Sequence, residues 1–488
     1  MQRFLLILLC LTTFACSEAR EDGPIAVGVI GDPVSVFAED AELPPAAHHL
    51  QAATVEGLVA LDPAGRIVPA LAERWIVTDD GLSYIFRLRS TDWADGELIT
   101  GEDVRQLFRA RLRELDGTAL GLDLAKVTDI RAMTGRVVEV RLSGPMPEFL
   151  RLLAQPELGL AKDGKGAGPM VLAENAEETQ VLLDAMPPEA RGMPARENWE
   201  EQASNVTIRA MPVSAALEAF SSGEIDLVIN GRLADFPDVE LGPLSRGTIQ
   251  LDPAYGLFGL VFLNDEGLLE DPDRREALSM AIDRGQLLQD FALDGWEYTT
   301  WTVPSPLFGE LGPVGNRWND LTVEERQGIA ARRMARFLEE TDGPVTLRLA
   351  MPAGRGSTFL FNRIAASWRP LGVTAQRVKI GEQADVELVD RLARYSSPRW
   401  FLNQFHCSLD RGICSPDADE MVEESLAILD PAAKQLLLAD AHEMMLEDEV
   451  YIPLGAPVRW SLVRGAVTAF EINPWGRHPL FPLSQPST

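Results

Sequence analysis

The side chains that could carry out acid–base or metal chemistry are few in this sequence. Of its five histidines, only His48 and His49 are adjacent. His442 and Glu443 open a run similar to the H-E-x-x-H zinc motif, but Leu446 occupies the place of the second histidine. The chain contains no G-x-S-x-G, no P-loop and no G-x-G-x-x-G with its following acid. We therefore expect that the protein is not an enzyme and uses no cofactor and no metal.

One segment of the chain has the groups to hold a charged solute. Arginines bind carboxylates through charge-assisted hydrogen bonds, and an aromatic ring beside amide groups suits an extended backbone. A packed tryptophan with amides at the surface is the alternative interpretation. The segment is residues 392–400 with its immediate neighbours, and its candidate residues are Arg391, Arg394, Arg399, Trp400, Asn403 and Gln404.

The four cysteines fall into two groups. Cys10 and Cys16 lie near the N-terminus, whereas Cys407 and Cys414 form one late pair. In an exported protein this pair would lie in an oxidising compartment, so we expect a disulfide between its two members. Closing so short a ring stabilises a fold by about 2–3 kcal/mol on the chain-entropy estimate. The pair is a weak candidate for a metal site, because it lacks a second cysteine pair and lies near one histidine, His406.

The N-terminus has the pattern of a secretion signal. A short cationic start is followed by the apolar residues 4–11, which are too few to span a bilayer. Ala15 and Cys16 resemble the lipobox of bacterial lipoproteins, although Thr13 stands where leucine is usual. We expect residues 1–15 to be removed, Cys16 to be the lipid anchor, and residues 16–23 to form the lipidated end and its tether. Ordinary signal-peptidase cleavage is the alternative.

The net charge and the composition exclude some classes of binding partner. The 488 residues have a formal net charge of −30, with 46% hydrophobic and 24% charged residues. Nucleic acid and anionic membrane surfaces would repel such a chain, so neither is expected as a partner. No later run approaches the length of a membrane-spanning helix, and we expect the rest of the chain to lie outside the membrane.

Residues 57–104 show what kind of elements surround the candidate groups. Residues 62–65 have turn chemistry between apolar runs. Two β-rich segments, residues 75–77 and 84–89, are separated by Asp79-Asp80-Gly81, which is a strong hairpin signal. The sequence therefore predicts an antiparallel hairpin here.

The order of this block resembles the extracellular solute-binding proteins, family 5, which include peptide- and nickel-binding subunits of ABC importers. The family pattern is P-x-LA-x-x-W, then DG-x-x-Y-x-F-x-LR, then W-x-DG-x-x-(I/V)-T-x-ED-V. Residues 69–104 match nearly every element in order, and Thr100 with Asp103 would cap the helix that follows.

Other segments extend the resemblance over most of residues 25–465. Each matches a family landmark: a turn, a strand entry, a helix, and two amphipathic helices followed by a strand. We also expect strands at residues 25–30 and 255–264, a short helix at 211–220 and a loop at 186–205. The matching segments are residues 166–170, with Met170 in place of an aromatic, 223–228, 271–284 and 415–454, whereas residues 105–160 and 305–345 match little.

The resemblance implies an α/β, two-lobed periplasmic-binding-protein-like fold of type II, the large peptide-binding class, with a cleft between the lobes. One lobe would comprise residues 24–254 completed by 460–488, and the other residues 260–455. Crossovers near residues 255–260 and 456–460 would form a hinge that closes the lobes around a ligand.

The resemblance also implies where a ligand would bind. In peptide-binding relatives an acidic residue just before the cysteine pair takes the α-amino group of an extended peptide. Ser396 and Ser397 stand at the corresponding places here, among arginines. Losing the partner of a buried ammonium costs on the order of 2–5 kcal/mol, so the ligand class would change unless Asp385 or Asp390 substitutes.

Three further features come with the resemblance. Arg355 lies near where dipeptide-binding relatives place an arginine for the ligand carboxylate, with a solvated loop arginine as the alternative. Trp296 and Trp301 would line the cleft or pack in the core. His48 and His49 would bind a metal chelate in a nickel-type relative, although such a pair in an Ala- and Pro-rich loop is usually at the surface.

The predicted function is that of a periplasmic or cell-envelope, lipid-anchored, monomeric substrate-binding subunit that delivers a peptide or peptide-like solute to an ABC permease. Two alternatives stay open. One is a binding protein for an anionic or N-blocked solute or a metal chelate. The other is an envelope lipoprotein that keeps the fold without transport.

Overall fold

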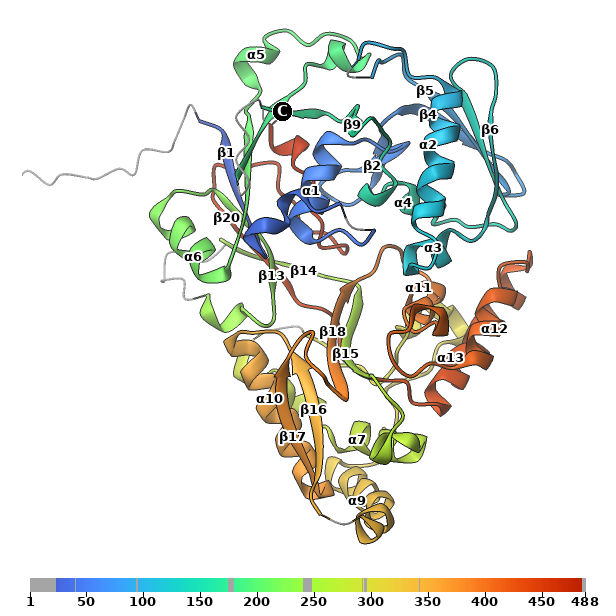
Figure 1. The fold of residues 1–488 in the computed structure, drawn as a ribbon, viewed down its shortest axis with the longest axis vertical. Coiled ribbons are helices and arrows are strands. Elements are labelled where there is room, and N and C mark those ends of the chain that lie inside the picture. Colours follow the sequence, from blue (N-terminus) through green and yellow to red (C-terminus); the bar gives the residue numbers. More distant parts are fainter. Residues whose placement is uncertain are drawn as a thin grey trace, which may run out of the picture.

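Figure 1 shows the computed structural model of the protein, which describes residues 23–484 except 40, 94, 174–179, 240–247, 292, 294–295 and 342. The predicted signal, the Cys16 anchor and the tether up to residue 22 lie outside the described residues. Within the described ranges, no helix is long and apolar enough to cross a membrane.

The upper part of the molecule in Figure 1 is built on a mixed seven-stranded sheet. Successive side chains of β1 point to opposite faces of this sheet, and each face is covered by a helix. Val27 and Val29 pack with α1 (Pro45–Thr54), whereas Ala26 and Ile30 pack with α6 (Val213–Ser222) on the opposite face. The strand order is β10 (Met170–Leu172), β11 (Gln180–Ala185), β12 (Val206–Met211), β1 (Ile25–Ile30), β13 (Leu227–Arg232), β20 (Arg459–Val463) and β14 (Ile249–Asp252).

A second, antiparallel sheet of four strands completes the upper part and contains the predicted hairpin. Tyr84, Phe86 and Leu88 are buried, as the alternation of that segment requires. Thr100 and Asp103 form both hydrogen bonds of a capping box at the start of α2 (Gly101–Glu114). The order is β4 (Ala72–Val77), β5 (Ser83–Leu88), β7 (Val137–Leu142) and β6 (Val127–Ala132).

The lower part is built on a five-stranded sheet, ordered β17 (Val373–Lys379), β16 (Val345–Met351), β18 (Val386–Leu392), β15 (Gly256–Phe262) and β19 (Tyr451–Gly455). The continuous apolar run of β15 is buried on both faces, as predicted. Phe258 and Leu260 face one core and Leu257 and Val261 face the other. The helices of this part are α7 (Pro272–Ala281), α8 (Arg284–Leu287), α9 (Val323–Glu340), α10 (Arg355–Trp368), α11 (Pro398–Asn403), α12 (Pro416–Glu424) and α13 (Pro431–Glu447).

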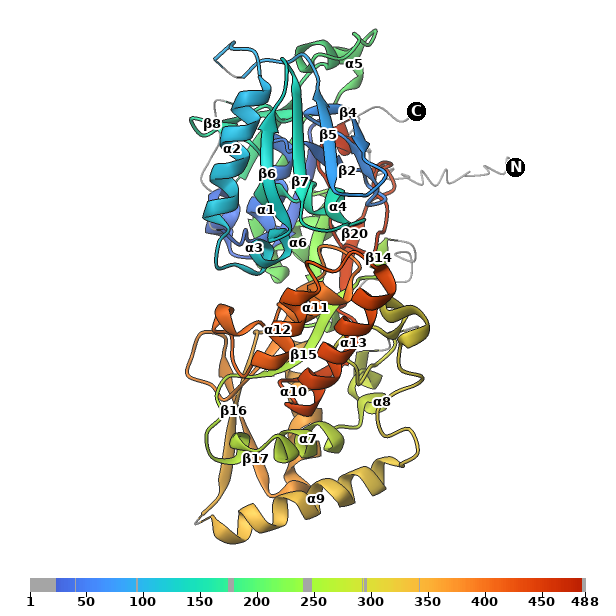
Figure 2. The ribbon, with the colours of Figure 1, turned by 90° about the vertical axis from the view of Figure 1, so that its right-hand side faces the viewer.

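The chain passes between the two parts twice. Residues 253–255 connect β14 of the upper sheet to β15 of the lower sheet, and residues 456–458 connect β19 back to β20. One apolar cluster also spans the parts, because it includes residues of the four-stranded sheet together with residues of α11, α12 and α13. Figure 2 shows α3 (Ala119–Leu124) of the upper part directly above α11.

A few local predictions differ from the structure. The helix predicted at residues 211–220 begins at Val213, because Met211 is still paired within β12. The predicted loop at residues 186–205 includes a short helix, α5 (Trp199–Gln202), whose tryptophan is buried. The remaining short elements are α4 (Phe149–Leu153), β2 (Val59–Leu61), β3 (Ile67–Pro69), β8 (Ala161–Lys162) and β9 (Lys165–Gly166).

Candidate functional site

A cavity of about 300 Å3 lies between the upper and lower parts, and we call it the cleft cavity. The upper part contributes the start of α1, the end of β13, the start of β20 and residues 476–477. The lower part contributes the end of β18 and the helix α11. The lining residues are Glu42, Leu43, Pro45, His48, His49, Glu157, Asn230, Arg232, Asp390, Arg391, Leu392, Arg394, Trp400, Gln404, Arg459, Gly476 and Arg477.

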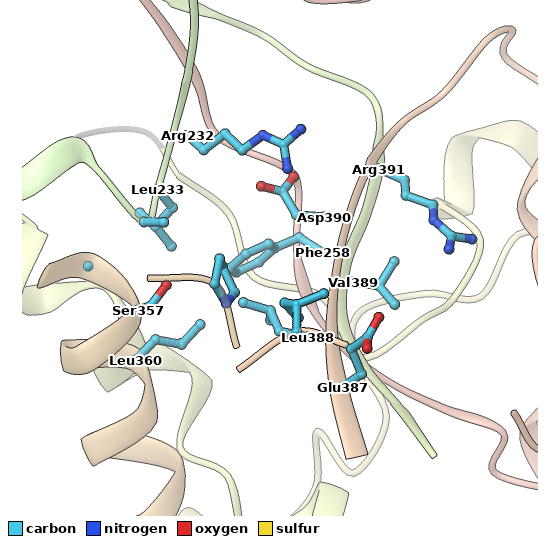
Figure 3. Close-up of a pocket in the computed structure, with 14 residues that line it drawn as sticks. Arg232, Leu233, Phe258, Ser357, Leu360, Glu387, Leu388, Val389, Asp390 and Arg391 are labelled. Atoms are coloured by element: carbon cyan, nitrogen blue, oxygen red, sulfur yellow. The ribbon is translucent and has the colours of Figure 1, made fainter. Parts of the chain in front are cut away.

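A second cavity of about 180 Å3, the α10 cavity, adjoins the first and shares Arg232, Asp390 and Arg391 with it. Figure 3 shows this cavity between the first turn of α10, the end of β13 and the strand β18. Ser357 in the first turn of α10 is 2% exposed, and its hydroxyl has no hydrogen-bond partner among the described residues. The two cavities are therefore neighbours at the boundary of the two parts, and we treat them together as the candidate site.

The open edge of β18 faces both cavities. On one side β18 pairs with β15 along its whole length, from Val386 to Leu392. On the other side β16 pairs with it only at Val386 and Glu387. Beyond Glu387 no described strand covers this edge, so an extended ligand could add to the sheet there.

Three ion pairs connect residues of the upper part with residues of the lower part around the site. Arg394 of the lower part pairs with Glu157 of the upper part at 3.3 Å. Arg459 in β20 pairs with Asp390 in β18 at 2.7 Å. A third pair joins Arg411 to Glu42. These pairs neutralise three of the carboxylates that line the cleft.

Two predicted site residues instead hold the two parts together. Arg399 donates hydrogen bonds to the backbone carbonyls of Leu122 and Asp123 in α3, and Asn403 donates to the Asp123 carboxylate at 2.8 Å. The hydroxyl of Tyr395 donates to the same oxygen at 2.9 Å. Burial raises the pKa of Asp123 to about 6, although Arg399 opposes the shift. Arg399 and Asn403 line neither cavity.

The other predicted site residues lie in different places. Arg394, Trp400 and Gln404 line the cleft cavity, with Trp400 only 1% exposed. Arg355 is the first residue of α10 rather than a loop residue, and it binds the carbonyl of Pro237 at 3.0 Å outside both cavities. Asp385, a candidate substitute for the amine partner, is paired with Arg348.

Trp296 and Trp301 line a third cavity of about 830 Å3, bordered by both connections between the parts. Their indole nitrogens donate to the carbonyls of Ala456 and Gly315. Neither tryptophan lines the cleft cavity.

The prediction that His48 and His49 lie at the surface in a loop is wrong. Both are in α1 and line the cleft cavity, where His49 is 7% exposed. Burial lowers the pKa of His49 to about 3, and burial together with Arg477 lowers that of His48 well below its ordinary value. Both imidazoles are therefore neutral at pH 7. Among the described residues, no three His, Cys, Asp or Glu side chains gather as a metal site.

The predicted disulfide is present, and it follows the site directly in the chain. Cys407 and Cys414 are bonded with their Cα atoms 5.2 Å apart. Their ring begins three residues after Gln404, so it constrains the backbone that leaves α11.

The comparison with known proteins decides the family. Residues 66–384 match the sequence profile described as "Bacterial extracellular solute-binding proteins, family 5 Middle". The chain belongs to this family. The family consists of solute-binding proteins, and the resemblance drawn from residues 69–104 is confirmed.

Relatives cover nearly the whole family 5 chain. The periplasmic oligopeptide-binding protein OppA of Salmonella typhimurium is 22% identical over 479 residues, covering 87% of this chain and 85% of that protein. Haemophilus influenzae OppA in complex with RPPGFSPFR has a TM-score of 0.77 at 18% identity, covering 96% and 100% of the two chains. NikA from Brucella suis in complex with Fe(III)-EDTA has a TM-score of 0.72 at 18% identity, covering 94% and 100%. The fold is therefore the predicted two-lobed α/β fold of the large peptide-binding class, with a cleft between the lobes.

Several site residues of this family 5 protein had no signal in the sequence. Asp123 and Glu157 lie in the stretch 105–160, where no landmark is recognisable. Arg232 is the last residue of β13 and Arg477 follows a turn, and neither segment has a charge pattern that marks it in the sequence. Only the fold brings these four residues beside β18 and α11.

Proposed function

We propose that this protein captures an extended, peptide-like solute between its upper and lower lobes and delivers it to an ABC permease. The observation that carries the proposal is the open edge of β18 in the cleft. Main-chain groups on such an edge bind an extended backbone irrespective of its side chains, while the cavities on either side accept those side chains.

The two connections at residues 253–255 and 456–458 would act as the hinge. Because both are short and join strands of different sheets, rotation there would separate the seven-stranded sheet from the five-stranded sheet. The apolar cluster that the four-stranded sheet shares with α11, α12 and α13 would have to open or move with one lobe. The lobes would then comprise residues 24–254 with 460–488, and residues 260–455. Asp123, Arg399 and Asn403 would hold the closed state rather than the ligand.

The relatives support the kind of solute and the compartment. The similar OppA proteins are described as periplasmic and oligopeptide-binding, and one was solved with a peptide, whereas NikA was solved with a metal chelate. We place this protein in the periplasm or cell envelope, lipid-anchored through Cys16, as a monomer that docks on membrane permease subunits.

The test is isothermal titration of the purified protein with pools of di-, tri- and pentapeptides, followed by small-angle X-ray scattering. We expect at least one pool to bind and to make the particle more compact. Binding at 100 times the dissociation constant should also add about 2.7 kcal/mol to the free energy of unfolding. Binding of no pool, together with binding of metal chelates, would refute the peptide-like assignment.

Two proline variants test whether the solute binds by adding a strand to β18 or only through contacts with side chains. Replacing Leu388 by proline removes a main-chain N–H from the open edge of β18. The N–H of Val389, one position away, lies on the side that pairs with β15, so Val389→Pro is the matched change that leaves the open edge unaltered. We expect Leu388→Pro to lose peptide binding and Val389→Pro to retain it, with a cooperative unfolding transition in both. Equal affinities in both variants would contradict a role for the strand edge.

A further inference from the structure

The charges that line the cleft do not balance. Every carboxylate that lines the cleft cavity already has an arginine partner. The pairs are Glu157 with Arg394, Asp390 with Arg459, and Glu42 with Arg411. Three guanidinium groups that line the two cavities are left without a carboxylate partner among the described residues. They belong to Arg232, Arg391 and Arg477.

Arg391 is the clearest of the three. It lines both cavities, and its side chain makes no hydrogen bond or ion pair with any described residue. Figure 3 shows it on the strand β18, on the side away from Arg232. Burial lowers its pKa to about 10, with a further contribution from Arg411, so it remains a cation at pH 7.

Arg477 is hydrogen-bonded, but only to neutral groups. Its Nη1 donates to the Gln155 side-chain oxygen at 2.6 Å and contacts the ring of His48, which is uncharged. Neither acceptor compensates the positive charge. Burial lowers the pKa of Arg477 to about 10, which again leaves a cation at pH 7.

The acidic groups near these cations are fewer. Glu387 lines the α10 cavity without an ion pair, and burial raises its pKa while Arg391 opposes the shift. Asp235 is electrostatically coupled to Arg232 but lines neither cavity. An excess of positive charge remains in the site, although the whole chain has a net charge of −30.

The α10 cavity adds a second feature that suits an anion. No side chain caps the N-terminus of α10, a helix of 14 residues, and the unpartnered hydroxyl of Ser357 lies in its first turn. Figure 3 shows this hydroxyl on the cavity side of the helix. A helix N-terminus with a free hydroxyl donor stabilises a carboxylate or phosphate.

We propose that the cleft selects solutes of net negative charge, with Arg391 as the residue that determines this selectivity. Unpaired, partly buried guanidinium groups are costly in the empty protein, and an anionic solute supplies the partners that they lack. This inference rests on the proposed function, because it specifies the class of peptide-like solute that the same site binds.

The experiment compares isosteric peptides that differ only in charge. Glu-Glu and Gln-Gln, and the corresponding tripeptides, are titrated into the protein at low and at moderate salt. We expect the Glu peptides to bind at least tenfold more tightly than the Gln peptides, with a difference that shrinks as salt rises. Equal or tighter binding of the Gln peptides would overturn the inference and leave the proposed function standing. Binding of neither series would overturn both.

Variants assign the selectivity to a residue. Arg391→Gln should weaken Glu-Glu binding at least tenfold and change Gln-Gln binding less than twofold. Arg336→Gln on α9 removes the same charge at a side chain that is 87% exposed and should change neither. Arg232→Gln serves as a second cleft variant with the same expectation as Arg391→Gln. An equal loss for both peptides in both cleft variants would show that the arginines shape the site without selecting charge.

Discussion

Lowering the pH from 7 to 5 should add a stabilising contribution to the closed protein through the protonation of Asp123. Asp123 is 0% exposed, and its contacts with Tyr395 and Asn403 join α3 of the upper lobe to residues 395–403 of the lower lobe. Burial raises its pKa from 3.8 to about 6. A proton therefore binds more tightly to the folded, closed protein than to the unfolded chain. The resulting stability is fully present below pH 4 and is lost as the pH rises through 6.

The magnitude follows from these two pKa values. Linkage gives a gain of about 1.3 kcal/mol between pH 7 and pH 5, which is roughly a tenfold change in an equilibrium constant. If Asp123 is exposed in the open state, the same factor applies to lobe closure and hence to solute affinity.

The control is Asp123→Asn, which the geometry allows with little disturbance. Both donors bind the Oδ1 atom, and Oδ2 has no partner among the described residues. An asparagine oxygen in the place of Oδ1 therefore keeps both hydrogen bonds and removes the titratable charge, whose interaction with Arg399 is lost at every pH at which Asp123 is ionised. The comparison also cancels other groups, such as Lys126, whose pKa burial lowers to about 7.

Urea unfolding of both proteins at pH 5, 6 and 7 measures the effect. The difference in free energy of unfolding between the native protein and Asp123→Asn should shift by about 1.3 kcal/mol in favour of the native protein as the pH falls to 5. A difference that is independent of pH, or that shifts the other way, would refute the reasoning.

Three further changes test the scaffold, each by urea unfolding. Glu56→Gln should lower the free energy of unfolding by about 3–5 kcal/mol, because it leaves two buried guanidinium groups, including that of Arg89, without their counter-charge; a loss below 1 kcal/mol would show that these cations find other partners. Cys414→Ser should cost about 2–3 kcal/mol by opening the ring to Cys407, and reductant should have no further effect on the variant. Thr100→Ala should cost about 1 kcal/mol by removing one half of the capping box of α2, with Thr100→Ser as the control that retains it.

The local sequence pattern was sufficient to predict those elements whose conformation is set by residues close together in the chain. The hairpin around residues 79–81, the capped start of α2 and the doubly buried β15 were all predicted, because turn chemistry, capping and alternation act over a few residues. The disulfide between Cys407 and Cys414 was predicted from cysteine usage, because an even pair in an exported protein lies in an oxidising compartment.

The family and the two-lobed fold also followed from the sequence, through an ordered match over residues 69–104 that the profile match to residues 66–384 confirms. The roles of individual charged residues did not follow. Arg394 and Arg399 have the same chemistry and lie five residues apart, yet one lines the cleft and the other binds α3. Their difference depends on which partner lies opposite, and those partners are more than 200 positions away in the chain.

The sequence by itself therefore determined the hairpin around residues 79–81, the capped start of α2, the buried strand β15 and the family. The tertiary structure alone decided which guanidinium groups have counter-ions, because an ion pair depends on distances across the cleft that no local pattern encodes. It also decided that His49 is buried, His48 half-buried and both neutral, since this environment and the neighbouring Arg477 arise only when the C-terminal segment packs against α1. The charge of the site is a property of the assembled lobes, while the chain as a whole is strongly acidic.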